Sequence, residues 1–260
     1  MAVSPSLAAA AFPVRQVPAE AAADAWLAEQ AAGRRAGFSP LLFLPHAPPP
    51  WADAASAASA HVFATDEIIA AYVSRLVYEE WALRQPGETP GFDAASPDAV
   101  EAALAAHKGH VPGDPYSYVS PDFDAVRERP APLEPEGLRL RILEPPPSFS
   151  HPGPQVAIAR IPTAESWRLP LFAGFGGWNA VPRPAEIAAF AQRWKRLHGA
   201  DIAAITTDTM EFIVAEPPAA FEAARRLAME HALFCPEDFG DLDVYVARLR
   251  TARTWSFWWD

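Results

Sequence analysis

At residues 172–184 the chain reads Phe-Ala-Gly-Phe-Gly-Gly-Trp-Asn-Ala-Val-Pro-Arg-Pro. This stretch lies between a strand-like run and a helix-like run. Its glycines let the backbone approach other groups closely, and its aromatic side chains can hold it in place. We therefore expect a strand-to-helix corner here, and this corner is the first candidate for a binding site. The residues in it that could contact a ligand or partner are Gly176, Gly177, Trp178 and Asn179.

The corner matches no phosphate-binding or dinucleotide-binding motif. It lacks the Lys and Ser/Thr of a P-loop, and its glycine spacing is not Gly-x-Gly-x-x-Gly. Amides at the start of the following helix could still hold a phosphate. The alternative, which we favour, is a tight turn in which Trp178 fills the core and Asn179 bonds to nearby backbone.

The residues around the corner indicate an α+β unit. The final strand, Thr-Trp-Ser-Phe-Trp-Trp, places three aromatic side chains on one face and Trp258 on the other. We expect a central strand covered on both faces, and the alternative is a strand with one exposed apolar face. The expected elements, in the order β-α-β-β-α-α-β, are 155–161, 184–198 with a stop at Gly199, 201–206, 209–215, 218–233, 242–249 and 254–259, with Thr207-Asp208 as a hairpin link.

Upstream, a strand at 14–17, a helix at 19–32 ended by Gly33 and a strand at 40–44 outline a β-α-β unit. Its two strands are expected to be parallel neighbours. Further helices are expected from Thr65 to Trp81 and from Ser96 to about His107. A half-exposed strand is expected at 138–143, because apolar residues alternate with arginine there.

Five prolines in residues 145–154 mark the sharpest change of composition. We therefore divide the chain into an N-terminal α/β subdomain (1–144), a Pro-rich connection (145–154) and a C-terminal α+β domain (155–260). The fold class expected is α+β, with two subdomains that each pack helices on a mixed sheet.

Composition limits the partners. The 260 residues are 50% hydrophobic and carry a net charge of -11, which indicates a globular protein and argues against nucleic acid or an anionic membrane as partner. The nearest thing to a basic run, Arg193, Lys195 and Arg196, is interpreted as the solvated face of a helix. Without a signal peptide or an apolar run long enough to span a membrane, a cytoplasmic protein is expected. No cofactor is expected.

His231 and Cys235 are four residues apart on one expected helix and share a face. With Asp208 they suggest a Cys-His-Asp nucleophile, but a single cysteine near a helix end is more often a small core residue. The seven histidines are scattered, and although His107 and His110 could share an ion with Asp114, we expect no metal site.

Three separated pieces resemble the bacterial family called domain of unknown function 4253. They are Phe175-Gly-Gly-Trp-Asn179 with Pro182, the strand-Thr-x-Asp-Thr-strand hairpin at 204–212, and the aromatic ending at 255–260; the helix end at His231 to Pro236 is also similar. The position before Pro182 is often cysteine in that family and is Val181 here, so no thiol chemistry is expected from it. The resemblance implies a shared fold and a cytoplasmic bacterial protein, and it brings no activity.

Two functions follow as hypotheses. The favoured one is a non-enzymatic binding or interaction protein for an unknown protein or small-molecule ligand, with an immunity-like, toxin-neutralising role as one form. The alternative is a hydrolase or transferase with its site between the corner and the hairpin. Its polar groups would be Asn179, Asp208, His231 and Cys235, and Trp178 would stack on the substrate.

Overall fold

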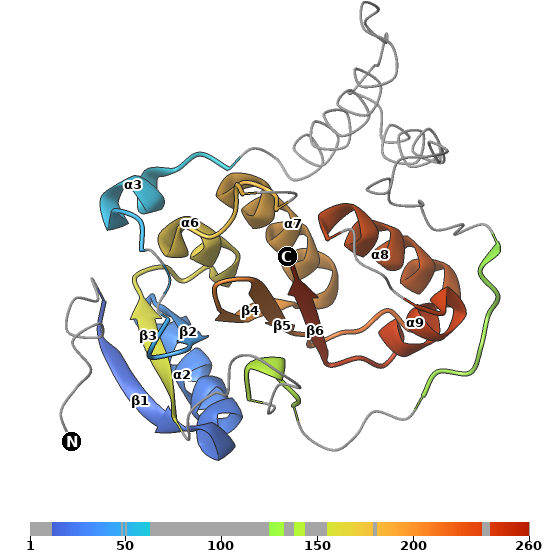
Figure 1. Cartoon of the computed structure of the whole chain (residues 1–260), viewed down its shortest axis with the longest axis horizontal. Coiled ribbons are helices and arrows are strands. Elements are labelled where there is room, and N and C mark those ends of the chain that lie inside the picture. The colour runs from blue at the N-terminus through green and yellow to red at the C-terminus, as the bar shows by residue number, and fades with distance from the viewer. Residues whose placement is uncertain are drawn as a thin grey trace, which may run out of the picture.

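The computed structural model describes residues 12–47, 49, 51–62, 125–132, 138–143, 155–178, 181–235 and 240–259. A mixed six-stranded sheet with the order β1-β3-β2-β4-β5-β6 lies at its centre (Figure 1). The strands are β1 (Val14–Pro18), β2 (Ser39–Phe43), β3 (Gln155–Ile161), β4 (Asp201–Ile205), β5 (Thr209–Ile213) and β6 (Thr254–Trp258). The helices are α2 (Ala22–Ala36), α3 (Ala54–Ser59), α6 (Leu169–Ala173), α7 (Pro184–His198), α8 (Phe221–Phe234) and α9 (Leu242–Leu249). The α+β class is confirmed.

Strand β3 lies between β1 and β2 and is antiparallel to both, while β2 pairs in parallel with β4. Strands β1 and β2 therefore run in the same direction, but the expectation that they are neighbours was wrong. The cause is β3, which is buried over most of its length and hydrogen-bonds on both edges. Strands from both sides of the Pro-rich segment thus share one sheet instead of forming two, and the domain boundaries drawn from composition stay a prediction.

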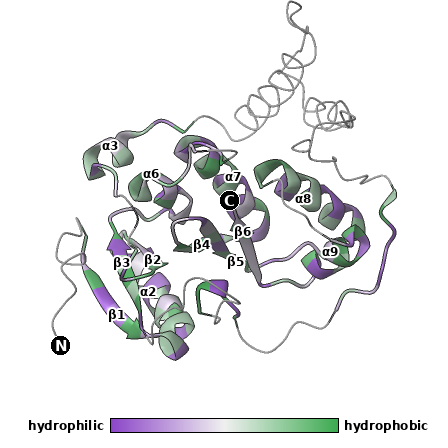
Figure 2. Cartoon of the chain, in the orientation of Figure 1, coloured by the Kyte–Doolittle hydropathy of each residue, from purple (hydrophilic) through white to green (hydrophobic). Residues whose placement is uncertain are grey.

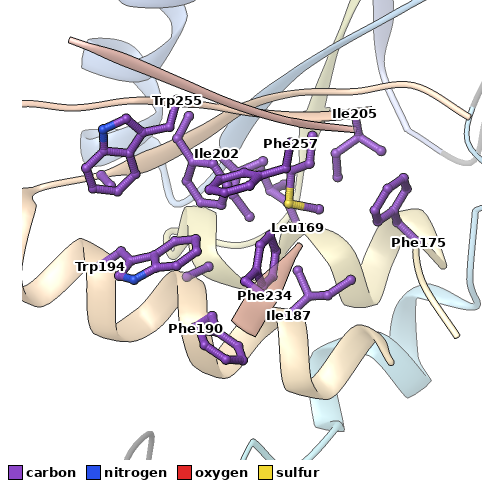
Figure 3. Close-up of a cluster of buried hydrophobic side chains, with 14 of the residues drawn as sticks. Leu169, Phe175, Ile187, Phe190, Trp194, Ile202, Ile205, Phe234, Trp255 and Phe257 are labelled. Carbon is purple, nitrogen blue, oxygen red and sulfur yellow. The ribbon is translucent and has the colours of Figure 1, made fainter. Parts of the chain in front are cut away.

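Each face of the sheet is covered. The larger core joins α6, α7, α8 and α9 to alternate strand residues such as Phe43, Phe212 and Phe257. Figure 3 shows part of this core, with Phe190 and Trp194 of α7 facing Trp255 and Phe257 of β6. The second core joins α2 to residues of the opposite face, among them Leu42 and Ile213. Figure 2 shows hydrophobic and hydrophilic residues interleaved along α2, α7, α8 and α9, as the burial of one helix side requires. No helix within the described ranges is long and apolar enough to cross a membrane.

Proline and glycine mark both ends of α7, but glycine does not mark the end that was expected for α2. Helix α7 begins with Pro184 at its first position and ends at Gly199, whose φ is +58°. The expected stop at Gly33 was wrong, because α2 continues to Gly37. Gly33 is required for a different reason: a Cβ there would lie 2.1 Å from the carbonyl oxygen of Phe38.

Two other expectations were wrong. Residues 138–143 form no strand, because Arg141–Leu143 is a 3₁₀ turn and the carboxylate of Glu211 accepts the backbone N–H groups of Arg141 (2.5 Å) and Ile142 (2.8 Å). Among the strands that the structure describes, β6 lies at the edge of the sheet and not in its centre, because it pairs with β5 alone. The helices expected at 65–81 and 96–107 lie outside the described residues.

Candidate functional site

The candidate residues are best located from strand β6, whose inner face is aromatic. The side chains of Trp255, Phe257 and Trp259 are buried in the larger core. Trp194 of α7 stacks on Phe257 at 5.4 Å between ring centroids, with 14° between the planes, and meets Trp255 edge-on at 5.7 Å (Figure 3). The last strand of the chain is therefore fixed by α7 as well as by β5.

His231 of α8 belongs to this aromatic cluster. Its side chain is 0% exposed, and its Nδ1 lies 2.7 Å from the hydroxyl of Tyr245 on α9. Burial, with a smaller contribution from the charge of His198, holds the pKa of His231 well below its usual value, so the ring is neutral at pH 7. Its neighbouring rings are those of Trp194 (4.9 Å), Trp255 (4.8 Å) and Phe257 (4.8 Å). An enclosed neutral imidazole of this kind is a packing residue.

Cys235, at the end of α8, holds the outer edge of β6. Its side chain is 1% exposed, and its Sγ donates to the carbonyl oxygen of Trp258 at 3.0 Å. A nucleophilic cysteine requires an accessible, ionised thiol in an electropositive setting. The position of Cys235 instead gives the thiol a structural contact with the edge strand.

Asp208 sits in the hairpin between β4 and β5, as the sequence predicted. Its Oδ1 accepts the hydroxyls of Thr206 and Thr209, both at 3.0 Å. Its Oδ2 accepts the indole N–H of Trp258 at 3.2 Å, and its carbonyl oxygen accepts the backbone N–H of Trp259 at 2.9 Å. The hairpin therefore binds the end of β6 through both side-chain and main-chain hydrogen bonds.

The glycine corner joins two helices and not a strand and a helix, because residues 166–173 form a 3₁₀ turn followed by α6. Gly177 donates its N–H to the carbonyl of Pro182 at 3.0 Å, which closes the turn on itself. Half-buried Trp178 meets Phe175 edge-on at 4.9 Å, and Phe175 in turn contacts Trp259 at 5.7 Å. Asn179 lies outside the described residues.

The described candidates thus meet along one strand. Asp208 and Cys235 hold Trp258, His231 packs on Trp255 and Phe257, and the corner reaches Trp259 through Phe175. We call this set the β6 anchor. It consists of Gly176, Gly177, Trp178, Asp208, His231 and Cys235. Asp208, His231 and Cys235 contact β6 directly, and Trp178 of the corner is linked to its end through Phe175.

Two buried carboxylates, Glu230 and Asp201, were missed. Glu230 accepts Arg193 Nη2 at 2.8 Å and the indole N–H of Trp194 at 2.9 Å. Asp201 pairs with Lys195 at 2.7 Å, so two residues of the run expected to be solvated neutralise buried charges. The spacing of Arg193 and Lys195 on either side of buried Trp194 was the available signal, because both flank the apolar face of α7.

Asp201 also accepts the hydroxyl of Ser166 at 2.5 Å, which brings a hydroxyl, a carboxylate and an amine together. This is not the arrangement of a nucleophilic serine, whose oxygen needs a base that can take its proton. The carboxylate of Asp201 is already bound by Lys195 and lies 3.5 Å from Arg34, and Ser166 is itself buried. The cluster ties the start of β4 to α2, α7 and the 3₁₀ turn.

In the part of the chain that the structure describes, no group of three or more His, Cys, Asp or Glu side chains could hold a metal ion. His107, His110 and Asp114 lie outside that part.

Residues 157–260 match the model of a protein family described as Domain of unknown function (DUF4253), as the three motifs suggested. No curated protein and no solved structure matches the chain. The matched residues run from β3 to the end of β6 and include the whole β6 anchor, whereas β1, α2 and β2 precede them.

Proposed function

We propose that the protein acts by binding a partner and not by catalysis. The observation that supports this is the state of the β6 anchor. His231 is neutral and enclosed, Cys235 is buried with its thiol bonded to β6, and the carboxylate of Asp208 is occupied by three donors. The hydrolase or transferase alternative would need His231 or Cys235 to reach a substrate, and the burial of both weighs against it.

Trp258 is the residue of β6 with an exposed large side chain. It is 42% exposed, on the face of the strand opposite the aromatic core, and its indole N–H is held by Asp208. A large aromatic side chain fixed in one orientation contributes contact area at little entropic expense, which is why tryptophan dominates many binding interfaces. Residue 258 is therefore the centre of the surface that we propose for recognition.

The net charge of -11 favours a partner that is basic. A protein or a cationic small molecule in a bacterial cytoplasm fits this proposal, and neutralisation of a basic toxin is one form it could take. A gene for such a toxin beside the gene for this chain would identify the partner directly.

The proposal predicts that Trp258→Ala loses the partner while the fold is kept. We expect affinity capture from extracts of the expressing cells to retain a protein with the wild-type chain. Loss of an exposed anchor tryptophan should weaken that complex by about 2 kcal/mol or more, roughly 30-fold. The unfolding free energy of Trp258→Ala should fall by only about 1 kcal/mol, because Trp258 is already 42% exposed and is not part of either core.

Leu27→Ala is the matched control, since Leu27 is also an exposed large apolar side chain, at 44%, and lies on α2, which covers the face of the sheet opposite to α7 and α8. It should capture the same protein as the wild type. If Trp258→Ala captures that protein as well as Leu27→Ala does, or if the wild type captures none, the surface has been assigned wrongly.

A further inference from the structure

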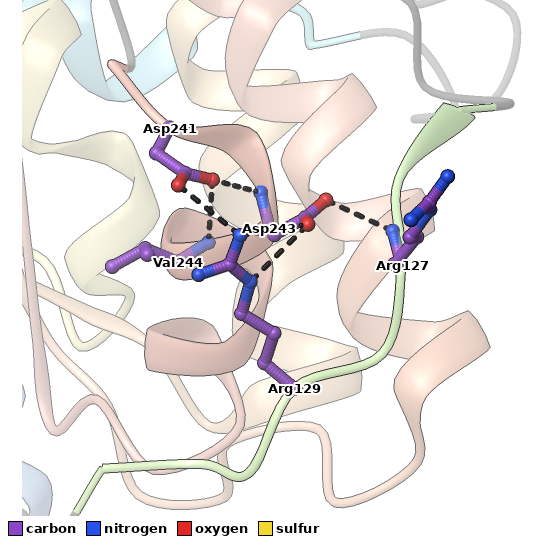
Figure 4. Close-up of polar contacts among 5 residues, drawn as sticks. All are labelled: Arg127, Arg129, Asp241, Asp243 and Val244. Atoms are coloured by element: carbon purple, nitrogen blue, oxygen red, sulfur yellow. Dashed lines mark hydrogen bonds and ion pairs between the residues drawn. The ribbon is translucent and has the colours of Figure 1, made fainter.

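Residues 125–132, Ala-Val-Arg-Glu-Arg-Pro-Ala-Pro, run as an extended strap beside helix α9 (Figure 4). The strap and the helix are more than a hundred residues apart in the sequence, so this contact is a tertiary one. Most strap residues are exposed, and Val126 is the strap residue that packs against the larger core. What holds the strap must therefore be mainly polar.

The start of α9 holds the strap through two carboxylates. Asp241 caps the helix by accepting the N–H groups of Asp243 (3.0 Å) and Val244 (3.3 Å). Asp243 faces outward, and its Oδ1 accepts the backbone N–H of Arg127 at 2.9 Å. Its Oδ2 accepts Nε (3.2 Å) and Nη2 (3.1 Å) of Arg129, which also lies 3.4 Å from Asp241 (Figure 4). One side chain, Asp243, thus binds both the main chain and a side chain of the strap.

The other end of α9 binds the strap with the opposite charge. Arg250 Nη1 pairs with Glu128 Oε1 at 2.9 Å and donates to the carbonyl oxygen of Arg129 at 3.3 Å. The hydroxyl of Thr251 donates to the carbonyl oxygen of Pro132 at 3.0 Å. Glu128 of the strap pairs with Arg250, and Arg129 pairs with Asp243. Because the two pairs have opposite polarity, a shift of the strap by one residue along α9 would place like charges together.

These contacts differ in kind from those that hold β6. The side chains of Arg129, Asp241 and Glu128 are 49%, 53% and 59% exposed, so each ion pair has at least one partner about half in water, although Asp243 and Arg250 are themselves 19% and 22% exposed. Exposed ion pairs are individually weak and are screened by salt, whereas buried aromatic contacts are not. We propose that residues 125–132 form an ionic latch on α9, closed through Asp243, which opens when its charges are screened or neutralised while the sheet and both cores stay folded.

Opening the latch would uncover the end of α9. Asp241 and Asp243 would then lose Arg129, and an acidic surface would face the solvent, available to a basic segment of another molecule. This surface is separate from Trp258, so the latch and the proposed recognition through Trp258 can be tested independently.

Trypsin gives a direct readout, because the bond after Arg127 is a cleavage site inside the strap. In Asp243→Asn at low salt, we expect cleavage after Arg127 to be about tenfold faster than in the wild type, because the ion pair with Arg129 is lost; mass spectrometry measures the rate. Raising NaCl to about 1 M shortens the Debye length to about 3 Å. Trypsin should then cleave the wild type as fast as it cleaves Asp243→Asn. The backbone N–H of Arg127 should exchange with solvent faster under the same conditions.

Glu222→Gln is the matched control, because it neutralises an exposed carboxylate whose ion-pair partner is Arg225 of α8 and not a residue of the strap. It should leave cleavage after Arg127 unchanged. Labelling of buried Cys235 reports on the fold in every sample and should stay slow. Equal cleavage in Asp243→Asn and the wild type, or opening accompanied by labelling of Cys235, would overturn the latch.

Discussion

Replacing Trp194 by alanine is expected to lower the free energy of unfolding by about 3–5 kcal/mol, the range found when large aromatic side chains are removed from cores. Trp194 is 0% exposed and lies where α7, α8, β5 and β6 meet. Its ring contacts are with Phe190, Phe212, His231, Phe234, Trp255 and Phe257. The substitution would also remove the donor to buried Glu230, which leaves a charge less well satisfied.

Urea denaturation followed by circular dichroism measures this effect, and Trp258→Ala is the matched comparison. Both variants exchange tryptophan for alanine, but Trp258 is exposed and its outer face contacts solvent. A loss for Trp194→Ala that is no larger than the loss for Trp258→Ala would mean that the aromatic cluster does not hold β6 in place.

Gly176→Ala should be the second most damaging change, with a loss of about 3 kcal/mol or more from strain and overpacking together. The φ angle at Gly176 is +110°, which side chains rarely adopt. A Cβ there would lie 2.2 Å from the carbonyl oxygen of Pro182 and 2.7 Å from Cδ1 of Ile187, so either the corner or the start of α7 must move. Thermal unfolding of the variant gives the magnitude.

Gly177→Ala separates the two causes. Gly177 also has a positive φ, +88°, but the nearest atom to a Cβ there is Cγ of Arg183 at 3.9 Å. Only the backbone strain remains, and we expect a loss of about 1–2 kcal/mol. If the two alanine variants were equally stable, the close approach of Pro182 would not be the reason that residue 176 must be glycine.

Local signals predicted the elements of the C-terminal part well. The boundaries of β3, α7 and α9 agree with the structure, because proline, glycine and apolar periodicity at these places all favour the same ends. The hairpin at Asp208 was also predicted, since its turn chemistry lies within four consecutive residues.

Long-range contacts decided the features that the sequence could not predict. Gly33 resembles a helix stop, but Phe38 returns over it and the helix continues. Residues 138–143 alternate like a strand, yet the carboxylate of Glu211, some seventy positions away, binds their backbone. The position of β3 between β1 and β2 likewise depends on pairing across more than a hundred residues.

The candidate site shows the same limit. Residue type and spacing singled out Asp208, His231 and Cys235, and in the structure all three contact residues of β6. Chemistry, however, depends on solvent access and on which hydrogen bonds are already made, and neither can be read from spacing. His231 carries the features of a catalytic histidine in the sequence and those of a core residue in the structure, because the aromatic side chains of three other elements enclose it.

We propose that the β6 anchor holds the strand and performs no nucleophilic chemistry. The reactivity of Cys235 tests this most directly, because the chain has one cysteine. The rate of alkylation by iodoacetamide is measured in the native protein and in urea, across a range of pH. We predict that the native thiol reacts at least about a thousandfold more slowly than the unfolded one, since it is exposed only when the fold opens. Alkylation of the native protein as fast as that of the unfolded chain, at a pH well below the usual thiol pKa of about 8.5, would contradict the account.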